Sequence, residues 1–236
     1  MRITYLILLL VTVNSFSQVK AGIIEYDVVL GIDEKFSTNE MLREYYSSAV
    51  ENSKYLKFKL LFNKEKALFT MNKVLTENQR AVDITIAFAN IRGNIYYLNG
   101  YTLIENENTF GKFLIKKKNV LKWELKNETK IIDQFLCYKA TTDFIVTNEK
   151  GRFVFPVVAW YCPKIPLPYG PNGYGGLPGL ILELQEKNTV FGAKTINLNP
   201  KEFISIKSID DSNAISEKDF DSIMDKNAKE MLDLKD

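Results

Sequence analysis

The chain has 236 residues, of which 46% are apolar and 12% aromatic, which is enough to form one substantial hydrophobic core. Its 31 basic and 29 acidic side chains almost balance, so the composition argues against disorder and offers no basic excess for a nucleic acid. The sequence contains no histidine, which excludes serine–histidine and cysteine–histidine catalysis and zinc sites with histidine ligands.

The first element in chain order is an apolar run over residues 3–13 that follows a basic start. A helix needs about 20 residues to cross a bilayer, so this run is too short for a membrane anchor. The small residues Ser15 and Ser17 after it are typical of a secretory signal peptide. A cut four residues further on and a buried N-terminal element are the alternatives. We expect residues 1–17 to be removed and residues 18–236 to form one exported domain without a transmembrane segment.

The next part of the chain predicts a helix among short strands. Ser37 or Thr38 can cap a helix whose apolar residues run from Met41 to Val50 at helical spacing. Runs of β-forming residues bounded by turns predict strands at residues 22–30, 55–62, 67–71, 83–89, 94–98, 113–117, 121–125 and 130–135. Short strands joined by tight turns favour antiparallel pairing.

Two cysteines lie in a predicted hairpin of residues 137–147 and 152–162. If the turn is symmetric about positions 149 and 150, Cys137 and Cys162 are directly opposite each other. In an oxidising compartment this pair predicts either a disulfide or two separate buried thiols. Pro156 could introduce a bulge that spoils the register.

Beyond the hairpin, strands are predicted at residues 180–184, 190–197 and 202–209. The chain then ends in a helix, because Ser216 and Asp219 resemble a capping box ahead of an apolar stripe. The stripe either packs on the sheet or binds a partner. We therefore predict an α+β fold: a single antiparallel, curved or half-barrel sheet with a helix in the N-terminal region and a C-terminal helix.

Residues 163–179 are the most unusual part of the sequence, with five of the seven prolines and five of the twelve glycines. Proline restricts φ and glycine permits positive φ, so the composition specifies a definite backbone path. Such a loop between two core strands is either a functional element or a structural crossover that covers the sheet.

The motif GLPGLI at residues 176–181 makes the chain recognisable. Further matching residues surround it, namely Lys139-Ala140, Trp160-Tyr161, Lys164-Ile165-Pro166 and Gly170-Pro171. The chain resembles the GLPGLI family of exported Bacteroidetes proteins over essentially its whole mature length. The resemblance implies export, a single domain and association with the cell envelope, in the periplasm or at the cell surface. It supplies no established activity and no catalytic residues, and Cys162 departs from the threonine typical of the family.

No nucleotide-binding, phosphate-loop or serine-nucleophile motif is complete in the sequence. No other motif in the sequence predicts a bound metal or cofactor. The leading hypothesis is a non-catalytic envelope binding or assembly protein that contacts an apolar or extended ligand such as a lipid or peptide. The residues expected to make that contact are Trp160, Tyr161, Tyr169, Tyr174, Gly176, Leu177, Pro178 and Gly179.

Two other functions stay open. Trp160, Tyr161, Tyr169 and Tyr174 could form a stacking platform for a carbohydrate, with Glu183 as the acid of a hydrolase. Alternatively, the Pro- and Gly-rich loop has a purely structural role and docks onto an outer-membrane transporter.

Overall fold

The computed structural model describes residues 19–74, 76–118, 121–148 and 151–233, so the predicted signal peptide lies outside the described residues. The strands are β1 (Ala21–Leu30), β2 (Lys57–Asn63), β3 (Ala67–Met71), β4 (Asn94–Leu98), β5 (Tyr101–Asn108), β6 (Gly111–Lys118), β7 (Glu124–Ile132), β8 (Phe135–Asn148), β9 (Gly151–Cys162), β10 (Leu180–Glu186), β11 (Thr189–Leu198) and β12 (Ile215–Ser216). The helices are α1 (Glu34–Ser37), α2 (Glu40–Ser53), α3 (Gln79–Phe88), α4 (Glu217–Asp233) and the 3₁₀ helix η1 (Pro171–Gly173).

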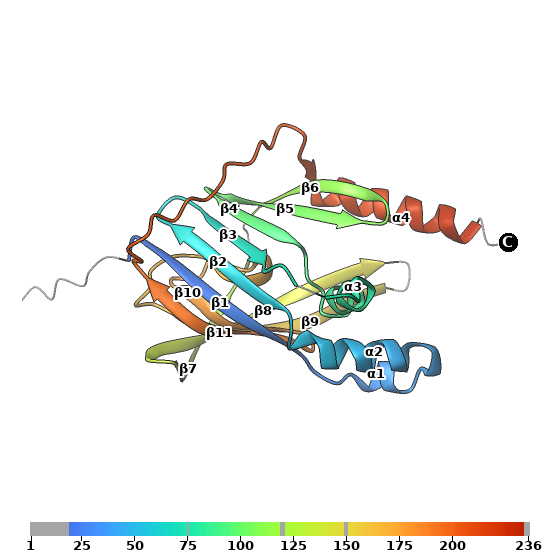
Figure 1. Cartoon of the computed structure of the whole chain (residues 1–236), viewed down its shortest axis with the longest axis horizontal. Coiled ribbons are helices and arrows are strands. Elements are labelled where there is room, and N and C mark those ends of the chain that lie inside the picture. Colours follow the sequence, from blue (N-terminus) through green and yellow to red (C-terminus); the bar gives the residue numbers. More distant parts are fainter. Residues whose placement is uncertain (1–18, 75, 119–120, 149–150, 234–236) are drawn as a thin grey trace, which may run out of the picture.

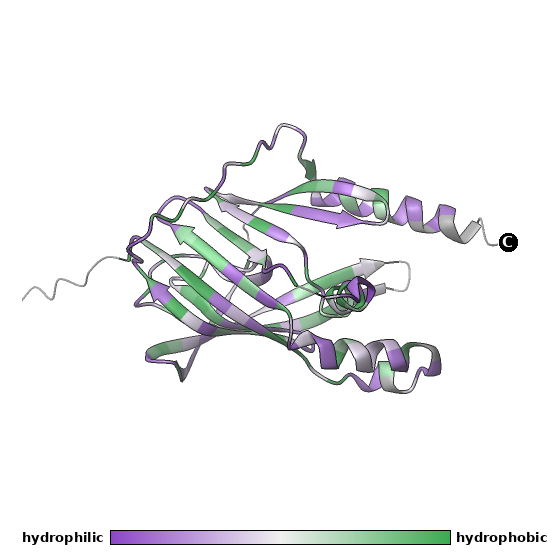
Figure 2. Cartoon of the chain, in the orientation of Figure 1, coloured by the Kyte–Doolittle hydropathy of each residue, from purple (hydrophilic) through white to green (hydrophobic). Residues whose placement is uncertain are grey.

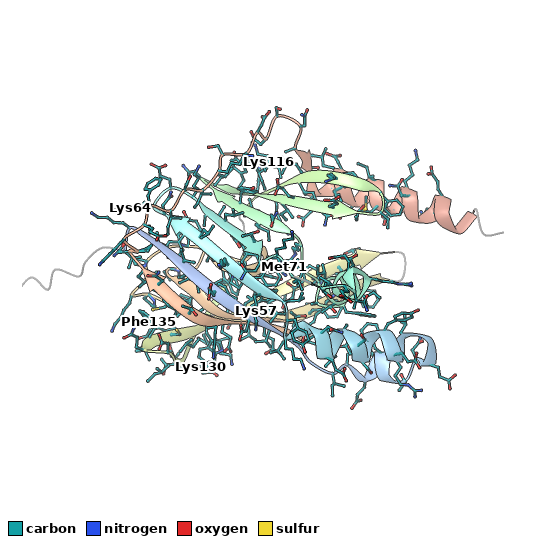
Figure 3. All side chains as sticks on the ribbon, in the orientation of Figure 1. Lys57, Lys64, Met71, Lys116, Lys130 and Phe135 are labelled. Carbon is teal, nitrogen blue, oxygen red and sulfur yellow. The ribbon has the colours of Figure 1, made fainter. Side chains whose placement is uncertain are left out.

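All the strands belong to one 12-stranded sheet in the order β12-β6-β5-β4-β3-β2-β1-β11-β10-β9-β8-β7. The sheet curls, so that β4–β6 lie across from β8 and β9 while β1 and β11 connect the two sides (Figure 1). Lys116 on β6 lies on one side of the molecule, and Lys130 and Phe135 on the β7–β8 hairpin lie on the other (Figure 3). β12 and β7 are the two free edges of this order, so the curled sheet does not close into a barrel.

The prediction of a single antiparallel sheet is wrong. After β11 the chain crosses over residues 199–214 to the far edge of the sheet, where Ile215 pairs in parallel with Ile115 of β6. β12 and β6 can pair in parallel because the long connection lets β12 run in the same direction as β6. Besides the two predicted helices, the chain also forms α1 and α3.

The concave face of the sheet holds the main hydrophobic core. Residues of β1 and β2 alternate between buried and partly exposed, and bands of hydropathy alternate along the strands in Figure 2. Phe58 and Phe69 stack with ring centroids 5.0 Å apart, and Phe191 meets Phe58 edge-on at 5.9 Å. All three are fully buried, and each such side chain contributes roughly 1.5–3 kcal/mol to folding.

A smaller cluster holds the helices to the end of β1. Tyr46 of α2 stacks on Phe36 of α1 with centroids 4.6 Å apart and meets Phe88 of α3 edge-on at 5.1 Å. Asn39 caps α2 by accepting a hydrogen bond from the Leu42 amide, so the predicted caps at Ser37 and Thr38 are wrong.

Several other predicted elements can be compared with the structure. Of residues 83–89, predicted as a strand, 83–88 lie in α3 and Ala89 caps its C-terminal end. Residues 202–209 are an extended connection without strand pairing. The capping box before α4 is confirmed, since the Asp219 amide donates to Ser216 Oγ at 3.1 Å. Phe220 of α4 packs edge-on against Phe113 of β6, so this part of the apolar stripe does pack on the sheet.

The register of the β8–β9 hairpin is confirmed along its length. Asn148 pairs with Gly151 and Tyr138 with Tyr161, and Pro156 pairs with Asp143 without a bulge. Cys137 and Cys162 are both buried and both free thiols, so no disulfide is present in this structure.

Candidate functional site

The Pro- and Gly-rich residues 163–179, called here the Pro–Gly segment, lie against the concave face of the sheet. Ile165, Leu167 and Tyr169 are buried while the prolines between them are exposed, as in an extended chain with one buried side. The Tyr169 ring packs 6.4 Å from that of Phe62 on β2 and 5.6 Å from that of Tyr97 on β4. The segment is therefore part of the core as well as the connection from β9 to β10.

Buried tyrosine hydroxyls hold the backbone of the segment. Tyr97 donates to the Gly170 carbonyl oxygen at 2.5 Å and accepts from the Gly173 amide at 3.0 Å. Tyr26 donates to the Ile181 carbonyl oxygen at 2.6 Å, just after the segment rejoins the sheet. Burial raises the pKa of Tyr97, although the Gly173 amide opposes this shift, so the hydroxyl keeps its proton at neutral pH.

Replacing Tyr97 with phenylalanine is expected to lower the free energy of unfolding by about 1–2 kcal/mol, because it leaves buried backbone groups unpaired. Urea unfolding followed by circular dichroism measures the change. Tyr55→Phe is the matched control, since Tyr55 is 60% exposed and should change stability by less than about 0.5 kcal/mol. Equal losses in the two variants would show that the Tyr97 hydroxyl does not support the segment.

A buried polar cluster, called here the Arg92 cluster, joins the segment to the turn after α3. The Arg92 guanidinium donates to Glu186 Oε2 at 2.9 Å, to the Asn172 carbonyl oxygen and to the Tyr174 hydroxyl at 3.4 Å. The Asn172 side chain accepts from the Arg92 amide at 3.1 Å and donates to the Asn90 carbonyl oxygen at 3.1 Å. Asn90 Nδ2 donates to the other carboxylate oxygen of Glu186.

Charge and stacking keep Arg92 protonated and in place. Burial alone would lower the pKa of Arg92, but Glu186 and Tyr174 outweigh it and raise the pKa. The Arg92 guanidinium lies 4.9 Å from the centroid of the Tyr174 ring and 5.4 Å from that of Phe144. Trp123 Nε1 donates to the Gly175 carbonyl oxygen at 2.9 Å, next to Tyr174. Tyr174 is therefore held on several sides.

A hollow of about 410 Å³, called here the Tyr174 hollow, opens between the two ends of the curled sheet. Two members of the Arg92 cluster, Arg92 and Tyr174, form its floor; one wall comes from β6 and α4, and the other from β8. The residues that define it are Arg92, Lys117, Lys118, Leu121, Phe144 and Tyr174. Lys117 is paired with Glu217 at 2.5 Å, and nearby Asp221 has a raised pKa because of partial burial and the charge of Glu217. The hollow combines aromatic surface with charges of both signs.

A second hollow of about 610 Å³, called here the Phe113 hollow, shares Arg92 as a wall. Its apolar surface comes from Phe58, Met71, Ile86, Ile91 and Phe113. Asn94, Glu105, Lys112 and Asp210 form a polar rim. Volumes of this size are typical of sites for small molecules. The two hollows together provide apolar surface next to a charged opening.

The structure distributes the predicted aromatic residues among different surroundings. Tyr169 is inside the core, Tyr174 lines the hollow named after it, and Tyr161 packs on Tyr138 with centroids 6.2 Å apart. Trp160 lies under Lys130 and Lys139, away from the hollows. This arrangement gives the four rings no shared stacking surface.

The remaining predicted site residues, in the GLPGLI motif and at Glu183, lie outside both hollows. Leu177 and Gly179 are buried, and Gly176 and Pro178 are exposed at the surface end of the Pro–Gly segment. Glu183 pairs with Lys130 at 2.6 Å and lies opposite Trp160 in the sheet. Its carboxylate is therefore engaged in an ion pair on the β9–β10 surface.

Sequence reasoning missed Arg92 and Glu186, which organise the site. They are 94 positions apart; Arg92 follows the turn after α3, and Glu186 is the last residue of β10, just before a turn. One local feature points to Glu186: it continues the apolar run 180–184. A charged residue at the end of a core strand is expected to need an ionic or hydrogen-bonding partner.

The described residues contain neither a cluster of metal-ligating side chains nor a helix able to span a membrane. Within residues 19–74, 76–118, 121–148 and 151–233, no group of three or more cysteine, aspartate or glutamate residues is arranged to hold a metal ion. Likewise, none of the described helices combines the length and the apolar character that crossing a bilayer requires.

Comparison with known proteins gives one family match and distant structural neighbours. Residues 148–183, which include all of β9 and the whole Pro–Gly segment, match the family model described as "Protein of unknown function (Porph_ging)". No curated protein matches the chain. Structures of PNGF-II in the C2 and P21 space groups align over 84% of this chain with 14% identity and a TM-score of 0.45. The chain covers 30% and 31% of the length of those two structures.

Proposed function

We propose that this protein is an exported, non-catalytic binding protein of the cell envelope that holds an apolar or extended ligand against the Pro–Gly segment. The observation that carries the proposal is the pair of hollows that share Arg92. The Tyr174 hollow lies between β6 and β8, and the Phe113 hollow lies among β2–β6 and α3. Export and the GLPGLI family are part of the proposal and rest on the signal-peptide pattern and the motif at residues 176–181.

The Arg92 cluster supports binding rather than chemistry. Its polar groups are engaged with one another, so they hold the floor of the site in one shape. A rigid floor reduces the ordering cost of binding. The apolar surface around Phe113 suits a hydrocarbon or aromatic group, and the charged opening at Lys117 and Lys118 suits the polar end of the same molecule.

The test uses the mature chain, organic extraction followed by mass spectrometry, and the fluorescent apolar probe N-phenylnaphthylamine. We expect a co-purifying apolar compound and saturable probe binding. Leu121→Glu in the Tyr174 hollow and Ile209→Glu in the Phe113 hollow should each weaken probe binding at least about 10-fold, because each places a charge on an apolar contact.

The matched control is Ile131→Glu on the edge strand β7, where the side chain is 70% exposed and lines neither hollow. This variant should bind the probe like the unaltered protein. Equal binding by all variants, or no extracted compound together with no probe binding, would contradict the proposal.

A further inference from the structure

Cys137 on β8 and Cys162 at the end of β9 occupy facing positions in the hairpin. The adjacent pair is Tyr138 with Tyr161, and the register is unbroken from there to the turn. Both cysteines are 0% exposed. The Cys137 thiol donates to the Phe135 carbonyl oxygen at 3.6 Å, and the Cys137 and Cys162 thiols are close enough to shift each other's pKa. Facing positions in an antiparallel pair place the Cα atoms within the range that a disulfide spans.

Cys162 is the last residue of β9 and directly precedes the Pro–Gly segment; its position is called here the root of the segment. Its carbonyl oxygen accepts from the Ile165 amide at 3.1 Å, and the Leu180 amide returns to the Ile165 carbonyl oxygen at 2.9 Å. Leu180 pairs with Cys162 across β9 and β10. A covalent bond at Cys162 would thus connect β8 to the point where the segment both leaves and rejoins the sheet.

The surroundings of Cys162 favour its thiolate form. The neighbouring Cys137 thiol, together with the backbone amides of Lys164 and Ile165 and the Lys164 charge, lowers the pKa of Cys162 to about 7, against the effect of burial. The thiolate is the form that attacks a disulfide. The neighbouring Cys162 thiol and burial raise the pKa of Cys137, which therefore keeps its proton in the reduced pair.

We propose that Cys137 and Cys162 are an oxidisable pair whose disulfide cross-links β8 to the root of the Pro–Gly segment. The oxidant is a disulfide, either a small molecule or an exported thiol oxidase. The Cys162 thiolate attacks it, forms a mixed disulfide and releases one thiol. Cys137 then loses its proton and attacks the Cys162 sulfur, which releases the second thiol. The chain loses two protons and two electrons, and the oxidant gains them. This inference does not depend on the proposed function.

Burial determines when the bond can form. An oxidant cannot reach two fully buried sulfur atoms in the folded sheet, so oxidation has to precede closure of the core or follow local opening. We therefore expect the cross-link to form during folding, and the reduced folded protein to react slowly.

The experiment refolds the reduced chain with a mixture of reduced and oxidised glutathione. We expect no free thiol in the denatured product, an intact mass lower by two hydrogen atoms, and a peptide containing Cys137 linked to one containing Cys162. In the folded reduced protein, both thiols should react with Ellman's reagent at least about 100-fold more slowly than in guanidinium. Protein isolated from a bacterial periplasm should carry the same cross-link, which provides a second measurement if refolding fails.

The control is the double variant Cys137→Ala/Cys162→Ala. Reductant should lower the urea midpoint of the oxidised protein and leave that of the double variant unchanged. A natively folded product that keeps two free thiols, or that carries glutathione on each cysteine, overturns the proposal. So does a urea midpoint of the oxidised protein that does not respond to reductant.

Discussion

Replacing Arg92 with methionine is expected to lower the free energy of unfolding by about 3–5 kcal/mol, because it leaves the buried Glu186 carboxylate without its ionic partner. Glu186 is 2% exposed, and Asn90 alone would still donate to it. Methionine keeps most of the aliphatic stem, so the change mainly reports the lost charge. Urea unfolding measures the effect, and thermal unfolding provides a second estimate.

The matched control is Lys57→Met, which removes a pair of similar geometry at the surface. Lys57 lies 2.9 Å from Asp27, but both side chains are more than 40% exposed. Exposed pairs of this kind contribute about 0–1 kcal/mol. The double variant Arg92→Met/Glu186→Gln should recover part of the loss, since it also removes the buried charge. Equal losses for Arg92→Met and Lys57→Met would refute a stabilising role for the cluster.

Gly179→Ala is expected to cost about 3 kcal/mol, although alanine is the smallest possible addition. A Cβ atom at this position would lie 2.3 Å from the Cys162 carbonyl oxygen and 2.8 Å from the Pro163 nitrogen. Both neighbours are backbone atoms, so the root of the Pro–Gly segment would have to move. Urea unfolding measures the loss, and Gly192→Ala is the control because nothing lies within 4 Å of a Cβ there.

The other glycine of the motif is needed for a different reason. Gly176 has a φ of +84° and open space around the position of a Cβ atom. Gly176→Ala should therefore cost about 1 kcal/mol through backbone strain, and Gly176→Asn should cost less because asparagine tolerates positive φ. If Gly179→Ala responded like Gly176→Ala, steric contact with Cys162 would not be the reason for Gly179.

The ambiguity at residues 83–89 shows where sequence patterns fail. A short apolar run is compatible with either a strand or a buried helix. The deciding contacts lie elsewhere, since Asn78 caps α3 and Phe88 packs edge-on against Tyr46 and Phe36. The crossover at residues 199–214 is similar, because the parallel pairing of β12 depends on strands that lie about a hundred positions earlier.

The sequence alone determined the features that depend on neighbours along the chain. The symmetric turn near Gly151 set the hairpin register, Ser216 and Asp219 began the last helix, and proline and glycine restricted the path of the Pro–Gly segment. Only the tertiary structure decided that this segment fills the curled sheet and that Arg92 and Glu186 meet beneath Tyr174. The physical reason is that local backbone preferences act within a few residues, whereas burial and charge pairing depend on distances that the whole fold creates.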